Sequence, residues 1–265
     1  MRRLVISALL LAFGTSPAWA QAEQQATVDR ATLAVQEVLS APEHANDAIA
    51  LLRQARAVMV CPRVFRAGFI FGGQGGDCVL AARDGGGSWS SPAFYGLNAG
   101  SVGFQIGIQD GMVIMMILTD QGLNAVLDSQ FKVGATASVA VAHIGAGIDG
   151  ATTAAVGADI VTFARNRGLF AGISLEGTML SARSDWNRAY YGRDVGPRQV
   201  VIGMEAHNPG SDPLRAALMR YGAPEASAAV APLAAAPPPA TAPRAGTPAP
   251  AGRIQQESLQ APPRR

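Results

Sequence analysis

The chain has 265 residues, with 21 basic and 19 acidic side chains and a formal net charge of +2 at pH 7. Two of the basic residues are Arg2 and Arg3, so the chain after residue 20 carries 19 charges of each sign. This balance provides no overall field that would attract nucleic acid, and we expect no nucleic-acid partner. Apolar residues make up 49% of the chain, which is ample for one packed core in about 200 residues.

The first twenty residues have the three parts of a cleavable secretion signal in the required order. The pair Arg2-Arg3 is followed by an apolar run at residues 4–13 and by the small-x-small cleavage site Ala18-Trp19-Ala20. The apolar run is shorter than the ~20 residues that a membrane-spanning helix needs, which argues against a permanent anchor. We therefore expect a periplasmic or secreted protein that begins at Gln21.

The chain has two cysteines, Cys61 and Cys78. Neither lies at the cleavage site, where a lipid-modified protein needs one, so we do not expect a lipoprotein. In an exported protein two cysteines favour a disulfide over metal ligands, and closing this loop would stabilise the fold by roughly 3 kcal/mol in the chain-entropy model. Two buried free thiols are the alternative.

Composition divides the remainder into a folded domain at residues 22–221 and a tail at residues 223–265. Ala, Pro, Thr and Ser dominate the tail. Such a segment cannot bury enough apolar surface to offset its ordering entropy, and we expect it to be disordered.

The start of the domain has the pattern of two helices, at residues 26–39 and 45–56. Apolar residues of the first occur at helical spacing: Val28, Leu33, Val35 and Val38. Residues 57–60 then predict a short buried strand, and residues 68–71 and 77–83 predict a hairpin around the glycine run 72–76.

The second half of the domain alternates apolar runs with Gly, Asp and Asn, which is typical of antiparallel sheet. Strands are expected at residues 101–109, 112–118, 135–144, 160–164, 169–175 and 178–182, and a helix at residues 120–128. The predicted fold class is α+β: N-terminal helices, then a mainly antiparallel, glycine-rich sheet.

No motif in the sequence supports catalysis, a cofactor or a metal. Gly145–Gly150 fits G-x-G-x-x-G, but it lacks the following helix, parallel strand and acidic residue that a dinucleotide site requires. The histidines His44, His143 and His207 have no ligand spacing. We expect a protein that is not an enzyme.

One local cluster points to binding. Four arginines lie within fourteen residues: Arg53, Arg56, Arg63 and Arg66. Aromatic and apolar residues lie among them: Val64, Phe65, Phe69 and Phe71. Arginine beside apolar side chains suits anionic head groups at a membrane surface. Helix-end capping by arginine and ordinary core packing by the aromatic residues are the alternative.

Several strings in the chain resemble the SYLF family of lipid-binding domains. They are Gly68-Phe69-Ile70-Phe71-Gly72-Gly73, Val79-Leu80-Ala81-Ala82-Arg83, Gly87-Ser88-Trp89-Ser90-Ser91-Pro92, Gly103-Phe104-Gln105-Ile106-Gly107, Gly134-Ala135, Ser138-Val139-Ala140, the string from Gly168 to Gly177, Asn187 and Tyr190-Tyr191-Gly192. The resemblance covers roughly residues 47–203. The chain departs from the family at Ala142-His143-Ile144-Gly145, where the family usually has Gly-Pro.

The resemblance implies a non-enzymatic lipid-binding module that contacts anionic lipid through the N-terminal amphipathic helix and the neighbouring arginines. Eukaryotic members are associated with phosphoinositide membranes, and a fungal branch with actin filaments. Neither actin nor a phosphoinositide is expected in a bacterial periplasm, so the resemblance and the secretion signal together predict a lipid of the cell envelope. The alternative is a structural or interaction protein of the envelope whose Pro-rich tail engages a partner. Trp89 is expected to be a packing residue.

Overall fold

The computed structural model describes residues 21–41, 45–68, 71–102, 107–128, 130–134, 137–143, 157–167 and 177–223. All of them belong to Met1–Ala228, the first of two units into which contacts divide the chain. The predicted secretion signal, the tail beyond residue 223, Gly145–Gly150 and the strand expected at 169–175 lie outside the described residues.

Among the described residues, two helices precede the sheet, α3 (Ala22–Ser40) and α4 (Ala45–Gln54). The strands are β1 (Ala57–Gly68), β2 (Phe71–Ala82), β3 (Ala93–Val102), β4 (Gly107–Ile117), β5 (Gln130–Lys132), β6 (Val139–His143), β7 (Ile160–Arg167) and β8 (Met179–Ala182). The other helices are α5 (Asp120–Leu127), α7 (Ser184–Tyr191), α8 (Pro197–Val201), the 3-10 turn η2 (Pro209–Ser211) and α9 (Asp212–Gly222).

The strands form one eight-stranded sheet in the order β5-β8-β3-β2-β1-β4-β7-β6. Every neighbouring pair is antiparallel except β6 and β7, which run parallel. The predicted fold class is therefore confirmed: helices lead into a mainly antiparallel sheet.

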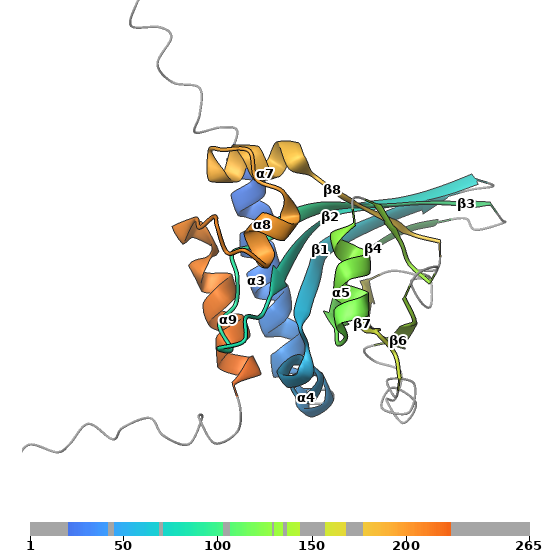
Figure 1. Ribbon diagram of the computed structural model, residues 1–265. Helices are drawn as coiled ribbons and strands as arrows, with labels where there is room; N and C mark the ends of the chain where they lie inside the picture. Colours follow the sequence, from blue (N-terminus) through green and yellow to red (C-terminus); the bar gives the residue numbers. More distant parts are fainter. Residues whose placement is uncertain are drawn as a thin grey trace, which may run out of the picture. The chain divides into compact units, whose positions relative to one another are not determined.

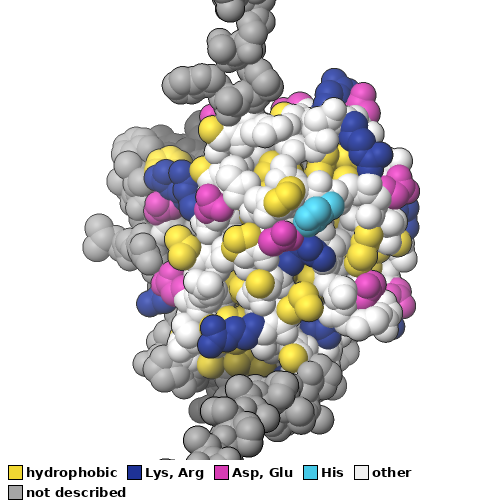
Figure 2. Space-filling view, turned by 90° about the vertical axis from the view of Figure 1, so that its left-hand side faces the viewer, with side chains coloured by type: hydrophobic (Ala, Val, Ile, Leu, Met, Phe, Trp, Pro, Cys, Tyr) yellow, Lys and Arg dark blue, Asp and Glu magenta, His cyan; other side chains and the backbone are white. Residues whose placement is uncertain are grey.

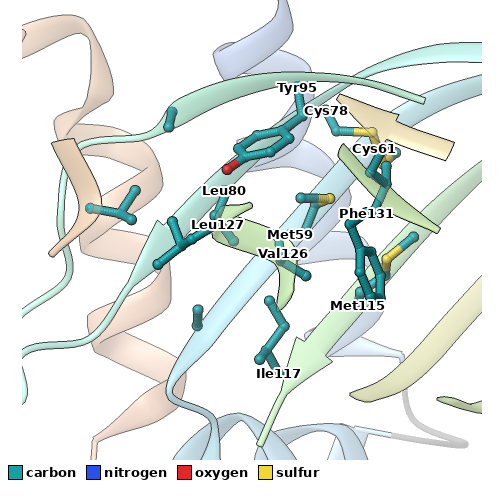
Figure 3. Packing of buried hydrophobic residues seen from close by; sticks show 14 of the residues in the cluster. Met59, Cys61, Cys78, Leu80, Tyr95, Met115, Ile117, Val126, Leu127 and Phe131 are labelled. Atoms are coloured by element: carbon teal, nitrogen blue, oxygen red, sulfur yellow. A yellow bond between two sulfur atoms is a disulfide. The ribbon is translucent and has the colours of Figure 1, made fainter. Parts of the chain in front are cut away.

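Helices cover both faces of the sheet, and Figure 1 shows α3 and α9 on one side and α5 on the other. Strand alternation assigns side chains to the two faces. In β1, Val58 and Val60 belong to the core under α3, α4, α7 and α9, whereas Met59 and Cys61 belong to the core under α5 and α8. Figure 3 shows this second core, which contains Met59 of β1, Leu127 of α5 and Phe131 of β5.

A disulfide between Cys61 and Cys78 joins β1 to β2 inside this second core (Figure 3). Both cysteines are fully buried. The structure thus has the bond that the sequence analysis favoured for an exported chain.

The expected hairpin around residues 72–76 is wrong. These glycines lie inside β2, which begins at Phe71; Gly76 pairs with Val64, and Gly72 pairs with Gly68 at the end of β1. The sequence suggested a turn because a glycine run is a common turn signal. Here β1 and β2 are each twelve residues long, far longer than the predicted strands.

The three helices that follow the sheet were not predicted. Helix α9 buries Leu214, Ala217 and Leu218 at helical spacing, and α9 packs beside α3. Residues 93–100 of β3 were also missed, because residues 93–97 are buried on both faces of the sheet and lack the polar alternation that marks a half-exposed strand. None of the helices that the structure describes is both long and apolar enough to cross a membrane.

Trp89 is fully buried, which confirms the prediction that it is a packing residue. The Arg83 guanidinium lies 4.8 Å from its ring centroid and donates to the backbone carbonyls of Leu52, Arg53 and Gly222. Arg83 therefore joins the C-terminal ends of α4 and α9, where a positive charge is favourable. Burial lowers the pKa of its guanidinium.

Candidate functional site

Two adjoining hollows lie between α3 and the outer half of β1, with volumes of about 220 and about 440 Å³. They share Arg30 on α3 and Pro62 and Arg63 on β1. We call them together the α3 groove. The lining of the α3 groove includes Arg30, Leu33, Pro62, Arg63, Phe65, Asp110 and Met112.

The α3 groove exposes two large apolar side chains. Leu33 is 63% exposed and lines the smaller hollow, and Phe65 is 43% exposed and lines the larger one. Leu33 was expected on the apolar stripe of the first helix, but it lies off the buried stripe formed by Val28, Val35 and Val38. The groove therefore offers two exposed apolar side chains, one on α3 and one on β1.

Most charges in the α3 groove are paired. Arg63 Nε lies 3.0 Å from Oδ2 of Asp110, and Arg165 forms an ion pair with Glu37. Within the part of the chain that the structure describes, Arg30 has no hydrogen-bonding or ionic partner. An anion that enters the groove would therefore meet Arg30 directly and would have to compete with Asp110 for Arg63.

The structure separates the four arginines that the sequence places close together. Arg53 lies in the last turn of α4, and Arg56 precedes β1 and pairs with Asp120 at 3.6 Å. Arg66 lies ten residues beyond Arg56 on the extended strand, or roughly 30 Å at the rise of a β-strand. One head group cannot contact all four, and only Arg63 lines the α3 groove.

Sequence reasoning underrated Arg30 and did not consider Leu33 as a surface residue. Their i, i+3 spacing places them next to each other on a helix, and this was the available signal. Nothing in the sequence indicates that this pair would face Arg63 and Phe65, because that depends on how α3 packs across β1.

A Ser-His-Asp set also meets in the structure, between the segment before β3 and the start of α9. Ser91 Oγ lies 3.1 Å from Nδ1 of His207, and His207 Nε2 lies 3.7 Å from Oδ1 of Asp212. A nucleophilic serine must be open to substrate, and its base must be held by a hydrogen-bonded carboxylate.

Neither condition is met. Ser91 is only 4% exposed, and its Oγ also contacts Oγ of Ser211 at 3.2 Å. The Asp212 carboxylate accepts a 2.9 Å hydrogen bond from Arg215 and is too far from His207 to orient it. The set is a structural network that ties α9 to the sheet. Among the described residues, no group of three or more His, Cys, Asp or Glu side chains is arranged to hold a metal.

The fold and the groove define an α+β domain that presents an open, amphipathic surface beside its first helix. Basic and acidic side chains are interspersed on the face shown in Figure 2, so this face has no patch of a single sign. The fold and the groove together are those of a domain whose surface is suited to binding a ligand.

Comparison with known proteins identifies a family that part of the chain resembles. Residues 98–221 match the family described as "Ysc84: Las17-binding protein actin regulator". The resemblance to SYLF domains is therefore confirmed. The groove residues on α3 and β1 lie before the matched segment, whereas Asp110, Met112 and Arg165 lie within it.

Eukaryotic proteins are similar to this chain over 53 to 62% of its length. "SH3 domain-containing YSC84-like protein 1" of Rattus norvegicus is 33% identical over 141 residues, which are 53% of this chain and 42% of the relative. The Homo sapiens protein of the same name is 32% identical over 141 residues, 53% of this chain and 41% of the relative. "LAS seventeen-binding protein 3" of Saccharomyces cerevisiae is 27% identical over 167 residues, 62% of this chain and 36% of the relative. The chain thus spans less than half the length of these relatives, whose names describe binding proteins or domain content and no enzyme.

Proposed function

We propose that this domain is a non-enzymatic binding module that docks on anionic lipid of the bacterial cell envelope through the α3 groove. One observation carries the proposal. The groove places exposed Leu33 and Phe65 beside two cations, and one of these, Arg30, has no partner among the described residues.

The physical basis is that of interfacial binding. Exposed apolar side chains enter the boundary between head groups and acyl chains, and neighbouring basic residues contact the anionic groups above them. Each basic residue near an anionic surface contributes ~1 kcal/mol, so Arg30 and Arg63 alone would give weak, salt-sensitive binding. Leu33 and Phe65 must supply the larger part.

The compartment is part of the proposal. Export through the predicted secretion signal would present the groove to envelope lipids in the periplasm or outside the cell. Actin and phosphoinositides, which are associated with the eukaryotic members, would then not be available as partners.

Sedimentation with vesicles tests the site. The chain from Gln21 onward should sediment with vesicles of phosphatidylglycerol and phosphatidylethanolamine more strongly than with phosphatidylcholine vesicles. The variant Arg30→Glu/Arg63→Glu should bind at least about tenfold more weakly, since it reverses two charges at the surface. Lys132→Glu is a control that reverses one charge outside the groove, where Lys132 is exposed on β5.

A second pair of variants separates the groove from the rest of the predicted cluster. Arg53→Glu/Arg56→Glu reverses two charges at the other end of β1. If this variant loses binding and Arg30→Glu/Arg63→Glu does not, the site lies at the end of α4. If both double variants retain full binding, the lipid binds neither at the α3 groove nor at the end of α4.

The names of the relatives favour a second candidate, an interaction protein of the envelope. The yeast relative is named for binding LAS seventeen, a protein partner. In this chain the Pro-rich tail would reach such a partner, and deletion of residues 223–265 would abolish capture of envelope proteins. The lipid proposal instead predicts that vesicle binding survives this deletion.

A further inference from the structure

Strand β1 has one residue more than either of its neighbours at the point where it enters the α3 groove. Toward β2, the register passes from Val60 opposite Val79 to Arg63 opposite Asp77, so Cys61 and Pro62 share one partner position, Cys78. Toward β4, it passes from Cys61 opposite Val113 to Val64 opposite Gly111. Two residues opposite one is the count that defines a β-bulge.

The bulge reverses which side chains of β1 face α3. Before it, Met59 and Cys61 face the core under α5. After it, Val64 faces that core, and Arg63 and Phe65 turn to the groove. Because side chains alternate with a period of two, a strand without the extra residue would point Arg63 and Phe65 away from α3.

Three local features hold the bulge in place. Pro62 has no N–H to donate to the ladder, which suits the unpaired position of a bulge. A Cβ at Gly76 would lie 2.3 Å from the carbonyl oxygen of Arg63, so only glycine fits opposite the bulged backbone. The Cys61–Cys78 disulfide ties the two strands at the same point, with Cα atoms 4.1 Å apart.

We propose that the disulfide and Gly76 are positioning residues for the α3 groove: they fix the bulge and thereby turn Arg63 and Phe65 toward α3. The disulfide lies in the core on the opposite face of the sheet, so it acts on the groove only through the backbone of β1. Its effect on lipid binding rests on the proposed function, but the orientation of Arg63 and Phe65 does not.

A matched pair of glycine variants tests the proposal. Gly76→Ala forces the bulged backbone to shift while the disulfide is kept. Gly73→Ala adds the same methyl group three residues earlier on β2, where its nearest neighbour is 3.9 Å away. The cross-strand NMR contact between Arg66 and Gln74 reports the register beyond the bulge. In Gly76→Ala this contact should disappear, or its signal should split into two sets that report two registers. In Gly73→Ala it should be unchanged.

The variant Cys61→Ala/Cys78→Ala tests the disulfide by the same contact, with a cooperative thermal transition as the check on folding. A folded double variant that keeps one unaltered Arg66–Gln74 contact would overturn the role of the disulfide. An unaltered contact in Gly76→Ala would overturn the role of Gly76 in fixing the bulge. If the double variant does not fold, the disulfide is needed for the fold as a whole, which overturns its specific role as a positioning element, and the glycine pair tests Gly76 alone.

Vesicle binding separates this inference from the proposed function. Gly76→Ala should bind phosphatidylglycerol vesicles about fivefold more weakly than wild type, as expected for withdrawal of one arginine from the surface. If wild type itself does not bind, the lipid proposal fails, and the NMR register still decides whether the bulge is fixed as proposed.

Discussion

Arg63 and Asp110 form a two-point ion pair between β1 and β4: Arg63 Nε lies 3.0 Å from Oδ2 and 3.2 Å from Oδ1 of Asp110. The two side chains are 65% and 46% exposed, so the pair is solvated and contributes no more than ~1 kcal/mol to stability. Its position in the α3 groove gives it another consequence. Asp110 competes with any anionic ligand for Arg63.

Asp110→Asn should therefore strengthen binding to phosphatidylglycerol vesicles about fivefold at low salt, because it frees Arg63 and removes a negative charge. The free energy of unfolding should change little. Asp120→Asn is the control, since it frees Arg56 from an exposed ion pair at the other end of β1. Equal gains in both variants would show that net charge, and not the groove, governs binding.

Leu33→Ser should weaken vesicle binding without lowering the thermal midpoint, because Leu33 is exposed and adds little to the core. Met219→Ser removes a comparably exposed apolar side chain from the neighbouring helix α9 and should leave binding unchanged. Vesicle sedimentation measures the first effect, and circular dichroism on heating measures the second. Retained binding in Leu33→Ser would remove α3 from the contact surface.

Asn187→Ala should destabilise the fold by ~1–3 kcal/mol, because it leaves a buried donor without its acceptor. Asn187 is fully buried, and its Oδ1 accepts a 2.9 Å hydrogen bond from the backbone N–H of Phe94. Asn124→Ala is the exposed control. Urea denaturation measures both; a loss below ~0.5 kcal/mol for Asn187→Ala would show that this contact is dispensable.

Asp159 gives a pH-dependent prediction. Its carboxylate accepts hydrogen bonds from Thr119 Oγ1 at 2.6 Å and from Ser138 N and Oγ at 2.9 and 2.8 Å, and these bonds lower its pKa below the ordinary value of 3.8. A lowered folded pKa stabilises the protein above the unfolded pKa, and this stabilisation is lost as the pH falls through the folded value.

The stability difference between wild type and Asp159→Asn should thus be constant from neutral pH to about pH 5 and should shrink below the ordinary carboxyl pKa. Urea denaturation at a series of pH values checks this. A difference that stays constant down to about pH 3 would mean that the pKa of Asp159 is not lowered by Thr119 and Ser138.

The sequence was sufficient for those parts of the fold whose signal is local. The helical spacing of Val28, Val35 and Val38 predicted α3. The resemblance to SYLF domains was recognised from short strings such as Gly103 to Gly107. It failed where the neighbouring strand determines the structure. Gly76 looks like part of a turn, and only the carbonyl of Arg63 opposite it explains the glycine.

The candidate site shows the same division. The arginines were found because they are close in sequence, but an extended strand carries Arg56 and Arg66 far apart. Arg63 and Phe65 face α3 because β1 has one extra residue. Its effect on the side to which these side chains point can be recognised only when the register with β2 and β4 is known. Sequence periodicity alone would assign them to the other face.

Carbene footprinting of the chain from Gln21 onward, with and without phosphatidylglycerol vesicles, tests the central claim most directly. We predict that vesicles protect Leu33 on α3 and Phe65 on β1, and leave Met219 on α9 and Ile202, both exposed in the free protein, as reactive as before. Protection confined to the tail beyond residue 223 or to the surface around Ile202, with Leu33 and Phe65 unchanged, would contradict docking through the α3 groove.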